Sequence, residues 1–284
     1  MTPTATTGWR ERRIIAAGTG VVVFESGSPA SDARTLVLVH GLGHWTQAAW
    51  DVLVPLLDPQ LHIVAFDLPG FGASDKPDAR YDTAFFATVV AAILDQVAPA
   101  SFVLCGHSLG GYIAANYAAT HSSRIERLIL IAPAGFLRAA RFVYALLGSQ
   151  LARWFFTRRP GRKFVDRTLN QSVVDPASIP RSIRDTAFVY ATQFEVRRAF
   201  AAVYTGAIQD FRQAPIVHGR LRAWSGPTLI IWGRQDRYIP IKALKTAQAV
   251  YPQAGVVICE HSGHLPMLEE APLVAAAITR FLNS

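Results

Sequence analysis

The chain has 284 residues, of which 51% are hydrophobic and 17% are charged, a composition that suits one large α/β domain with an insertion and excludes extended disorder. No stretch reaches the roughly 18 uncharged apolar residues that a membrane-spanning helix needs, and no signal-peptide pattern opens the sequence. We therefore expect a cytoplasmic protein, with residues 1–8 as a loose tail and with Cys105 and Cys259 as buried free thiols.

Short apolar runs alternate with helical patterns through the first half of the chain. The expected strands are Arg13–Ala17, Val21–Glu25, Thr35–Val39, Leu61–Phe66, Ser101–Cys105 and Arg127–Ile131, and the expected helices are Gln47–Leu57, Phe85–Val97 and Leu109–Thr120. Gly18-Thr19-Gly20 indicates a hairpin between the first two strands. This alternation predicts a mainly parallel sheet with helices on both faces.

The strand pattern stops after Pro133. Residues 134–222 are rich in Arg, Phe and Ala, and fifteen basic and five acidic residues give them a charge of +10, which leaves −2 for the remainder. Prolines and a glycine interrupt this block at Pro160-Gly161, Pro176, Pro180 and Pro215. We expect several helices joined by loops here. The strand pattern returns at Thr228–Trp232 and Gly255–Cys259, with helices expected at Ile241–Val250 and Pro272–Leu282.

The strongest chemical signal is the pentapeptide Gly106-His107-Ser108-Leu109-Gly110. It fits the pattern G-x-S-x-G and lies between an expected strand and an expected helix, which is the setting of a nucleophile elbow. In such an elbow the serine occupies a strained turn, and small neighbours let the strand and the helix approach closely. Ser108 is therefore the predicted nucleophile.

A serine hydroxyl needs a base to take its proton, and the base needs a carboxylate to orient it. His264, in the loop after the last strand, is the predicted base, and His261, at the strand end, is interpreted as a surface residue. Asp236 is the predicted carboxylate, because residues 132–134 provide no acid after the preceding strand. The order Ser, Asp, His is the one that this architecture uses.

The charge that develops on an attacked carbonyl oxygen needs backbone N–H donors. We expect these from Leu109, next to the nucleophile, and from Leu42, in the loop after the Thr35–Val39 strand. His40 is interpreted as a hydrogen-bonding residue and not as a second base. Tentative substrate-binding residues are His40, Trp45, Phe136 and Trp154. The chemistry requires no metal ion and no organic cofactor.

The chain carries five motifs in order: His40-Gly41 with Trp50, the segment from Asp67 to Pro77, the Ser108 elbow, Trp232-Gly233 with Asp236, and Gly263-His264-Leu265-Pro266. Together they resemble the α/β-hydrolase superfamily, in particular its cap-bearing serine hydrolases of the esterase and lipase branch. The resemblance implies the α/β-hydrolase fold, a mostly parallel eight-stranded sheet flanked by helices, with a helical cap inserted after the sixth strand. Residues 1–133 and 223–284 then form the core domain, and residues 134–222 the cap.

Within this resemblance, Ser108 argues against dehalogenases and epoxide hydrolases, which carry Asp as nucleophile. We expect hydrolysis of a carboxylic ester of a hydrophobic acyl or aromatic substrate through an acyl-enzyme. Hydrolysis of a carbon–carbon bond of the meta-cleavage type, or acyl transfer, would use the same triad, although Leu109 departs from the Met that commonly follows the nucleophile in the carbon–carbon hydrolases. A non-catalytic ligand-binding or accessory protein on the same fold is the alternative of another class.

The partners follow from the basic cap. Its arginines and aromatic residues, from Phe136 to Arg159, favour helices that line an apolar substrate tunnel, and weak contact with a membrane surface is the alternative. No nucleic-acid partner is expected, because no nucleic-acid-binding module accompanies the positive charge. The sequence does not indicate the oligomeric state.

Overall fold

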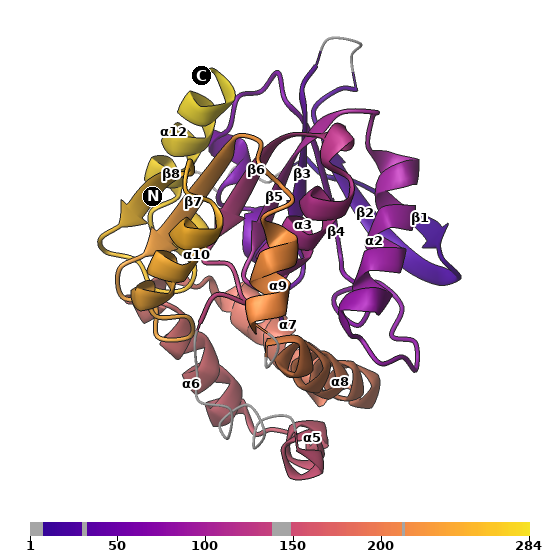
Figure 1. Ribbon diagram of the computed structural model, residues 1–284. Coiled ribbons are helices and arrows are strands. Elements are labelled where there is room, and N and C mark those ends of the chain that lie inside the picture. The colour runs from indigo at the N-terminus through magenta and orange to yellow at the C-terminus, as the bar shows by residue number, and fades with distance from the viewer. Residues whose placement is uncertain (1–7, 30–32, 138–148, 212–213) are drawn as a thin grey trace.

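The computed structural model describes residues 8–29, 33–137, 149–211 and 214–284 (Figure 1). Residues 1–7 of the expected tail lie outside these ranges, and so do residues 138–148 of the basic, aromatic segment. Cys105 and Cys259 are buried free thiols, as predicted. Within the described ranges, none of the helices combines the length and the apolar character needed to cross a bilayer.

Eight strands form one sheet in the order β1-β2-β4-β3-β5-β6-β7-β8. They are β1 (Arg10–Ala16), β2 (Thr19–Ser26), β3 (Thr35–Val39), β4 (His62–Phe66), β5 (Phe102–His107), β6 (Ile125–Ile131), β7 (Thr228–Gly233) and β8 (Gly255–Cys259). β2 pairs antiparallel with β1 and β4, and the other neighbours are parallel. The predicted mostly parallel eight-stranded sheet is confirmed.

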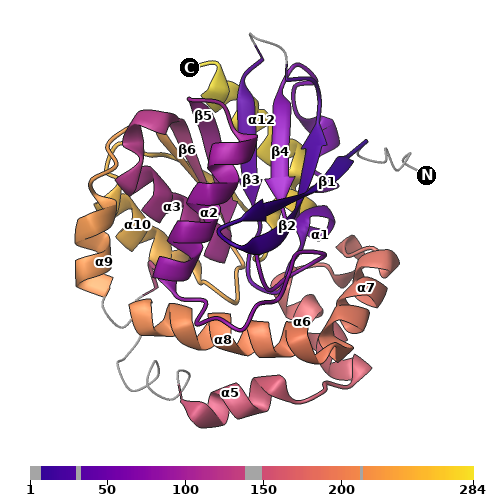
Figure 2. The ribbon, with the colours of Figure 1, turned by 90° about the vertical axis from the view of Figure 1, so that its right-hand side faces the viewer.

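Helices cover both faces of the sheet. α2 (Thr83–Val97), α3 (Leu109–Thr120) and α10 (Leu244–Val250) cover one face, and α1 (Thr46–Trp50) and α12 (Ala271–Leu282) cover the other. Figure 2 shows α2 and α3 in front of the sheet and α12 behind it. Side chains of β3 alternate between the two apolar layers, with Val37 and Val39 in one and Leu36 and Leu38 in the other. Burying each such side chain contributes about 1.5–3 kcal/mol.

One expected helix is shorter than predicted. The helical pattern of Gln47–Leu57 gives only α1, which ends at Trp50, followed by a turn and a 3₁₀ helix at Val54–Leu56. Pro55 lies in the first turn of this 3₁₀ helix. Because proline has no N–H and its ring clashes with the preceding turn, α1 cannot continue through it. A four-residue helix, α11 (Pro266–Glu269), was also not expected.

The block between β6 and β7 is helical, as predicted. Within its described residues the helices are α5 (Gln150–Thr157), α6 (Arg162–Ser172), α7 (Arg181–Thr192), α8 (Phe194–Phe211) and α9 (Ala214–Leu221). We call α5 to α8 the cap helices, because Figures 1 and 2 show them beyond the carboxyl ends of the parallel strands, whereas α9 lies beside α3. The division into a core of 1–133 and 223–284 and a cap of 134–222 stays a prediction.

Candidate active site

Ser108 stands in a tight turn between β5 and α3. Its backbone has φ 53° and ψ −117°, a strained conformation for a residue with a side chain. A Cβ at Gly110 would lie 2.2 Å from the carbonyl oxygen of Val39, and one at Gly106 would lie 2.3 Å from that of Gly110. These contacts are with backbone, which cannot move aside, so both positions need glycine. The G-x-S-x-G pattern is therefore required by the close approach of β3, β5 and α3.

Three side chains from separate loops form one hydrogen-bonded line. The Ser108 hydroxyl lies 3.0 Å from His264 Nε2, and His264 Nδ1 lies 2.7 Å from Asp236 Oδ2. The side chains of His264 and Asp236 are 9% and 0% exposed. A carboxylate can only accept, so Nδ1–H donates to Asp236, and Nε2 is free to accept from the serine hydroxyl. This arrangement is able to remove a proton from Ser108.

The carboxylate of Asp236 is held by the backbone that follows it. Its Oδ1 accepts hydrogen bonds from the N–H groups of Tyr238 and Ile239, both at 2.8 Å. Oδ2 is thereby left facing His264, which fixes the orientation of the imidazole. The position of Asp236 after β7 agrees with the prediction.

The loop that carries His264 is tied to the last residue of α6 and to the residues that follow it. The N–H of His264 donates to the carbonyl oxygen of Ser172 at 2.7 Å. The carboxylate of Glu269 accepts from Gly263 N at 2.7 Å and from Val174 N at 2.6 Å, so it joins the two segments. The cap therefore helps to position the imidazole. Burial raises the pKa of Glu269, although its backbone hydrogen bonds oppose that shift.

His261 lies apart from this line. It is exposed, and its backbone N–H donates to Glu270 Oε2 at 2.9 Å. The structure thus brings His264, and not His261, to Ser108.

The N–H groups of Leu42 and Leu109 lie in the two segments that meet at Ser108. Leu109 is the first residue of α3, where an N–H has no partner within its own helix. Neither N–H group donates to an acceptor in the described part of the chain. The loop that carries Leu42 packs directly on the elbow, since a Cβ at Gly41 would lie 3.0 Å from Ser108 Cβ. Two free donors are therefore present, one in the elbow and one in the loop packed on it.

A cavity of about 720 Å³ opens above Ser108 and His264. Leu42 and Trp45 of the loop after β3 lie in its wall. Aromatic side chains of the cap helices form much of the remainder: Phe155, Phe156, Phe164, Tyr190, Phe200 and Tyr204. Trp45 meets Tyr190 edge to face, with ring centroids 5.2 Å apart, so the core and the cap are in contact across the cavity. Such an apolar pocket with few polar groups is typical of a small-molecule site.

Three predicted substrate contacts need correction, because His40, Phe136 and Trp154 are not among the described residues that line this cavity. His40 is fully buried, and its Nε2 accepts from Leu68 N while Nδ1 donates to Gly41 O, so it is structural. Phe136 is buried in the core, where it stacks on His218. Trp154 is 53% exposed.

His44 is a cavity residue that the sequence analysis missed. Burial, with smaller contributions from His40 and His264, lowers its pKa to about 3, so the ring is neutral at physiological pH. Its Nδ1 is buried and has no hydrogen-bond partner within the described ranges. Its ring lies 5.7 Å from that of His107. A neutral imidazole beside Ser108 offers a polar contact to a bound molecule, and a lone histidine in a loop gives no sequence signal of this.

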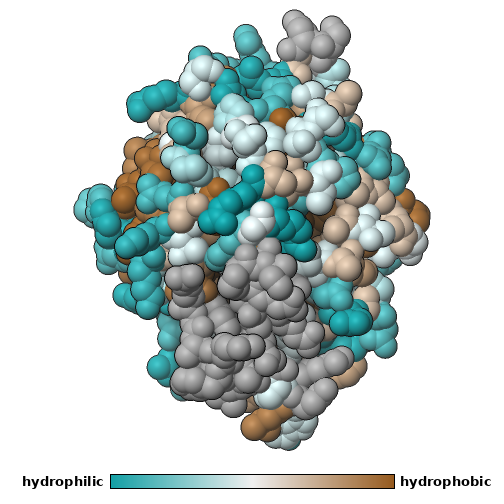
Figure 3. All heavy atoms as spheres, viewed as in Figure 1, coloured by the Kyte–Doolittle hydropathy of each residue, from teal (hydrophilic) through white to brown (hydrophobic). Residues whose placement is uncertain are grey.

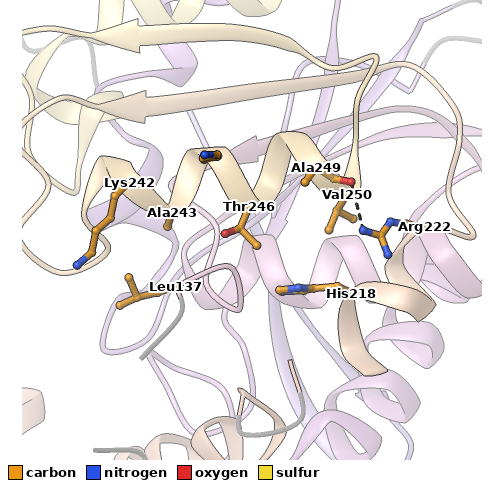
Figure 4. A pocket seen from close by; sticks show the side chains of 9 residues that line it. Leu137, His218, Arg222, Lys242, Ala243, Thr246, Ala249 and Val250 are labelled. Carbon is orange, nitrogen blue, oxygen red and sulfur yellow. Dashed lines mark hydrogen bonds between the residues drawn. The ribbon is translucent and has the colours of Figure 1, made fainter. Parts of the chain in front are cut away.

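A second hollow, of about 470 Å³, lies between α9 and α10 (Figure 4). Arg222, Lys242 and Lys245 contribute positive charge to its wall, and Arg222 also donates to the carbonyl oxygen of Ala249. Ser108, Asp236 and His264 do not line it. Of these two cavities, Ser108 and His264 line the larger one.

Known proteins support the same architecture. The family model described as alpha/beta hydrolase fold matches residues 34–271. The 2-hydroxymuconate semialdehyde hydrolase of Pseudomonas sp. (strain CF600) is 26% identical over 275 residues, covering 95% of this chain and 93% of that protein. The dihydrolipoyllysine-residue acetyltransferase component of the acetoin cleaving system of Pseudomonas putida is 30% identical over 261 residues, and this match spans 91% of this chain but only 64% of that protein.

Among solved structures, a membrane phospholipase A, described as a novel bacterial virulence factor, is similar with a TM-score of 0.79 and 29% identity. The similarity covers 98% of this chain and 86% of that one. The family match spans most of the chain, and the sheet and the elbow agree with it. The chain therefore belongs to the α/β-hydrolase fold family.

Proposed function

We propose that this chain hydrolyses carboxylic esters of hydrophobic acyl or aromatic substrates through an acyl-enzyme. The observation that carries the proposal is the hydrogen-bonded line from Asp236 through His264 to Ser108 at the base of an aromatic cavity. Activation of a serine requires a base in contact with the hydroxyl and an orienting group behind that base, and both are in place.

The proposed reaction has two halves. Ser108 Oγ attacks the acyl carbon while its proton passes to His264 Nε2, and the imidazolium is stabilised by Asp236. The N–H groups of Leu42 and Leu109 stabilise the oxyanion of the tetrahedral intermediate. The imidazolium then gives its proton to the departing alkoxide, which leaves as the alcohol. In the second half, His264 takes a proton from water, the hydroxide attacks the acyl carbon, and Ser108 recovers a proton as the acid departs.

The cavity supports the choice of substrate. Its wall is mainly apolar and includes many aromatic side chains, while Arg158, Arg159 and Arg197 add positive charge to it. Each Å² of apolar substrate surface that is buried in the cavity contributes about 25 cal/mol to the binding free energy. Affinity for the transition state should therefore grow with acyl length until the cavity is filled.

A second candidate keeps the triad and changes the bond. The similarity to 2-hydroxymuconate semialdehyde hydrolase favours cleavage of a carbon–carbon bond next to a carbonyl as this second candidate. Acyl transfer to an alcohol or thiol, in place of water, would also begin with the same acyl-enzyme.

A panel of p-nitrophenyl esters of increasing acyl length tests the proposal. We expect kcat/KM to rise from acetyl to medium-chain esters, and the Ser108→Ala variant to lose at least about 10⁴-fold. His264→Ala should be similarly impaired, whereas His261→Ala, a change at an exposed histidine nearby, should retain activity. A strict preference for acetyl esters would contradict the apolar tunnel.

A fluorophosphonate probe and two alternative substrates separate the remaining candidates. Labelling of the wild-type protein but not of Ser108→Ala would support an activated serine. A folded protein that takes no label would defeat the enzyme hypothesis in favour of a ligand-binding protein. Turnover of a ring-fission diketone faster than of any ester would favour the carbon–carbon hydrolase, and ester products formed with an alcohol acceptor would favour acyl transfer.

A further inference from the structure

Large apolar side chains are exposed at the surface of two cap helices. Leu151, Trp154 and Phe155 of α5 and Phe164 of α6 are each between 52% and 67% exposed, and we call these four the apolar patch. The first three have the spacing i, i+3, i+4, so they share one side of α5. The rings of Phe155 and Phe164 lie 6.3 Å apart. Figure 3 shows hydrophobic side chains at the lower tip of the molecule, where α5 lies in Figure 1.

Positive charge surrounds the apolar patch. Residues 149–168 include six basic side chains and one acidic side chain, Asp166, which pairs with Arg162. The guanidinium of Arg158 lies 4.0 Å from the centre of the Trp154 ring. The remaining cations with described side chains are Arg158, Arg159, Lys163 and Arg167, and none of them forms an ion pair with a described carboxylate. The charge around the patch is therefore not neutralised by these neighbours.

The apolar patch is continuous with the cavity. Phe155 and Phe164 are more than half exposed, yet both also line the cavity above Ser108, and Arg158 and Arg159 lie in its wall as well. An apolar molecule could thus pass from the outer surface of α5 and α6 into the cavity along aromatic side chains.

We propose that the apolar patch docks on a lipid surface that carries anionic headgroups. Aromatic rings settle at the boundary between headgroups and acyl chains, and arginines and lysines beside them meet the negative surface potential. A second copy of this chain is a poorer occupant, because face-to-face association would bring two uncompensated clusters of cations together. The inference stands apart from the proposed function, since lipid binding is measured without turnover.

Trp154 provides a direct probe of the docked state. It is more than half exposed, whereas the other five tryptophans are buried or half-buried. The whole protein is mixed with vesicles of phosphatidylcholine alone or of equal parts phosphatidylcholine and phosphatidylglycerol, with bromine on the acyl chains as a quencher. We expect quenching with the anionic vesicles, weaker quenching with the neutral ones, and loss of the quenched component in Trp154→Phe. An absence of quenching with anionic vesicles would overturn the proposal.

Matched variants test the chemistry of the surface. The double change Arg158→Gln and Arg159→Gln should lower partitioning to anionic vesicles by about fivefold for each charge, whereas Lys245→Gln with Arg280→Gln, on α10 and α12, should not. Leu151→Ser should weaken binding, whereas Leu273→Ser, at an exposed leucine of α12, should leave it unchanged. Equal effects of both members of either pair would contradict a local docking face.

Two controls keep this result separate from catalysis and from self-association. Ser108→Ala should bind vesicles as the wild type does, so inactivity towards esters would not bear on docking. Sedimentation without lipid reports the oligomeric state. A dimer that Leu151→Ser dissociates, together with no vesicle binding, would assign the patch to a second copy and refute the proposal.

Discussion

The substitution Asp236→Asn isolates the orienting role of the carboxylate from its structural role. Oδ1 accepts two backbone N–H groups at 2.8 Å, and the carbonyl oxygen of an asparagine can keep both hydrogen bonds. The amide nitrogen is then forced into the place of Oδ2, 2.7 Å from His264 Nδ1. Because that nitrogen is a donor, Nδ1 must become an acceptor, and the imidazole proton moves to Nε2.

The consequence falls on Ser108. With a proton on Nε2, His264 cannot accept the hydrogen bond that now spans 3.0 Å from the serine hydroxyl. The neutral amide also cannot stabilise an imidazolium. We expect kcat/KM to fall by about 10⁴-fold, which corresponds to about 5.5 kcal/mol of transition-state stabilisation. The midpoint of thermal unfolding should change little, because the backbone contacts persist.

The assay is hydrolysis of the best ester of the panel at pH 8, with thermal unfolding recorded on the same samples. Asp175→Asn is the matched control, since this exposed carboxylate accepts from Ala177 N at 2.9 Å and lies outside the hydrogen-bonded line. Retention of more than about a tenth of the wild-type kcat/KM by Asp236→Asn would refute the assignment of the tautomer.

Two further predictions concern stability. In the folded protein His44 has a pKa of about 3 and stays neutral at pH 5, whereas in the unfolded chain its pKa is about 6.5 and it takes up a proton. Protonation therefore favours the unfolded chain, and the free energy of unfolding should be about 2 kcal/mol lower at pH 5 than at pH 8. Urea unfolding of His44→Gln should show that pH-dependent loss reduced by about 2 kcal/mol, and equal losses would contradict the argument. Gly110→Ala should lose about 3 kcal/mol or fail to fold, because its Cβ would meet the carbonyl oxygens of Val39 and His40, whereas Gly219→Ala, with open space around it, should be tolerated or stabilising. Wild-type stability of Gly110→Ala in urea would refute the packing argument.

The hydrogen-bonded line was accessible from sequence because each of its members follows a strand. Ser108 comes after β5, Asp236 after β7 and His264 in the loop after β8, and the carboxyl ends of parallel strands meet at one edge of the sheet. The positions of these loops depend on strand order alone, which the alternating pattern of the chain already constrains. Their side-chain types then make the chemistry recognisable.

The cavity wall could not be predicted in the same way, because it depends on which side of each helix packs inward. Trp154 and Phe155 are neighbours in sequence, yet successive residues of a helix point about 100° apart, and only Phe155 reaches the cavity. Phe136 has an aromatic side chain of the kind that lines a pocket, but it packs into the core against His218. The break between α7 and α8 at Gln193 has no proline or glycine signal, so it reflects tertiary packing.

The hydrogen bonds that join the end of α6 and the residues after it to the loop of His264 bear on how such enzymes diversify. Ser172 and Val174 contribute backbone groups, so their side chains can vary freely during evolution while the contacts persist. A change in the number of residues there is different, because it would shift the register of those groups and displace the imidazole. Substrate specificity can therefore change through point substitutions along α5 and α7. Insertions and deletions between α6 and α7 should be selected against. Exchange of the cap between relatives should give an active protein only where this junction keeps its length.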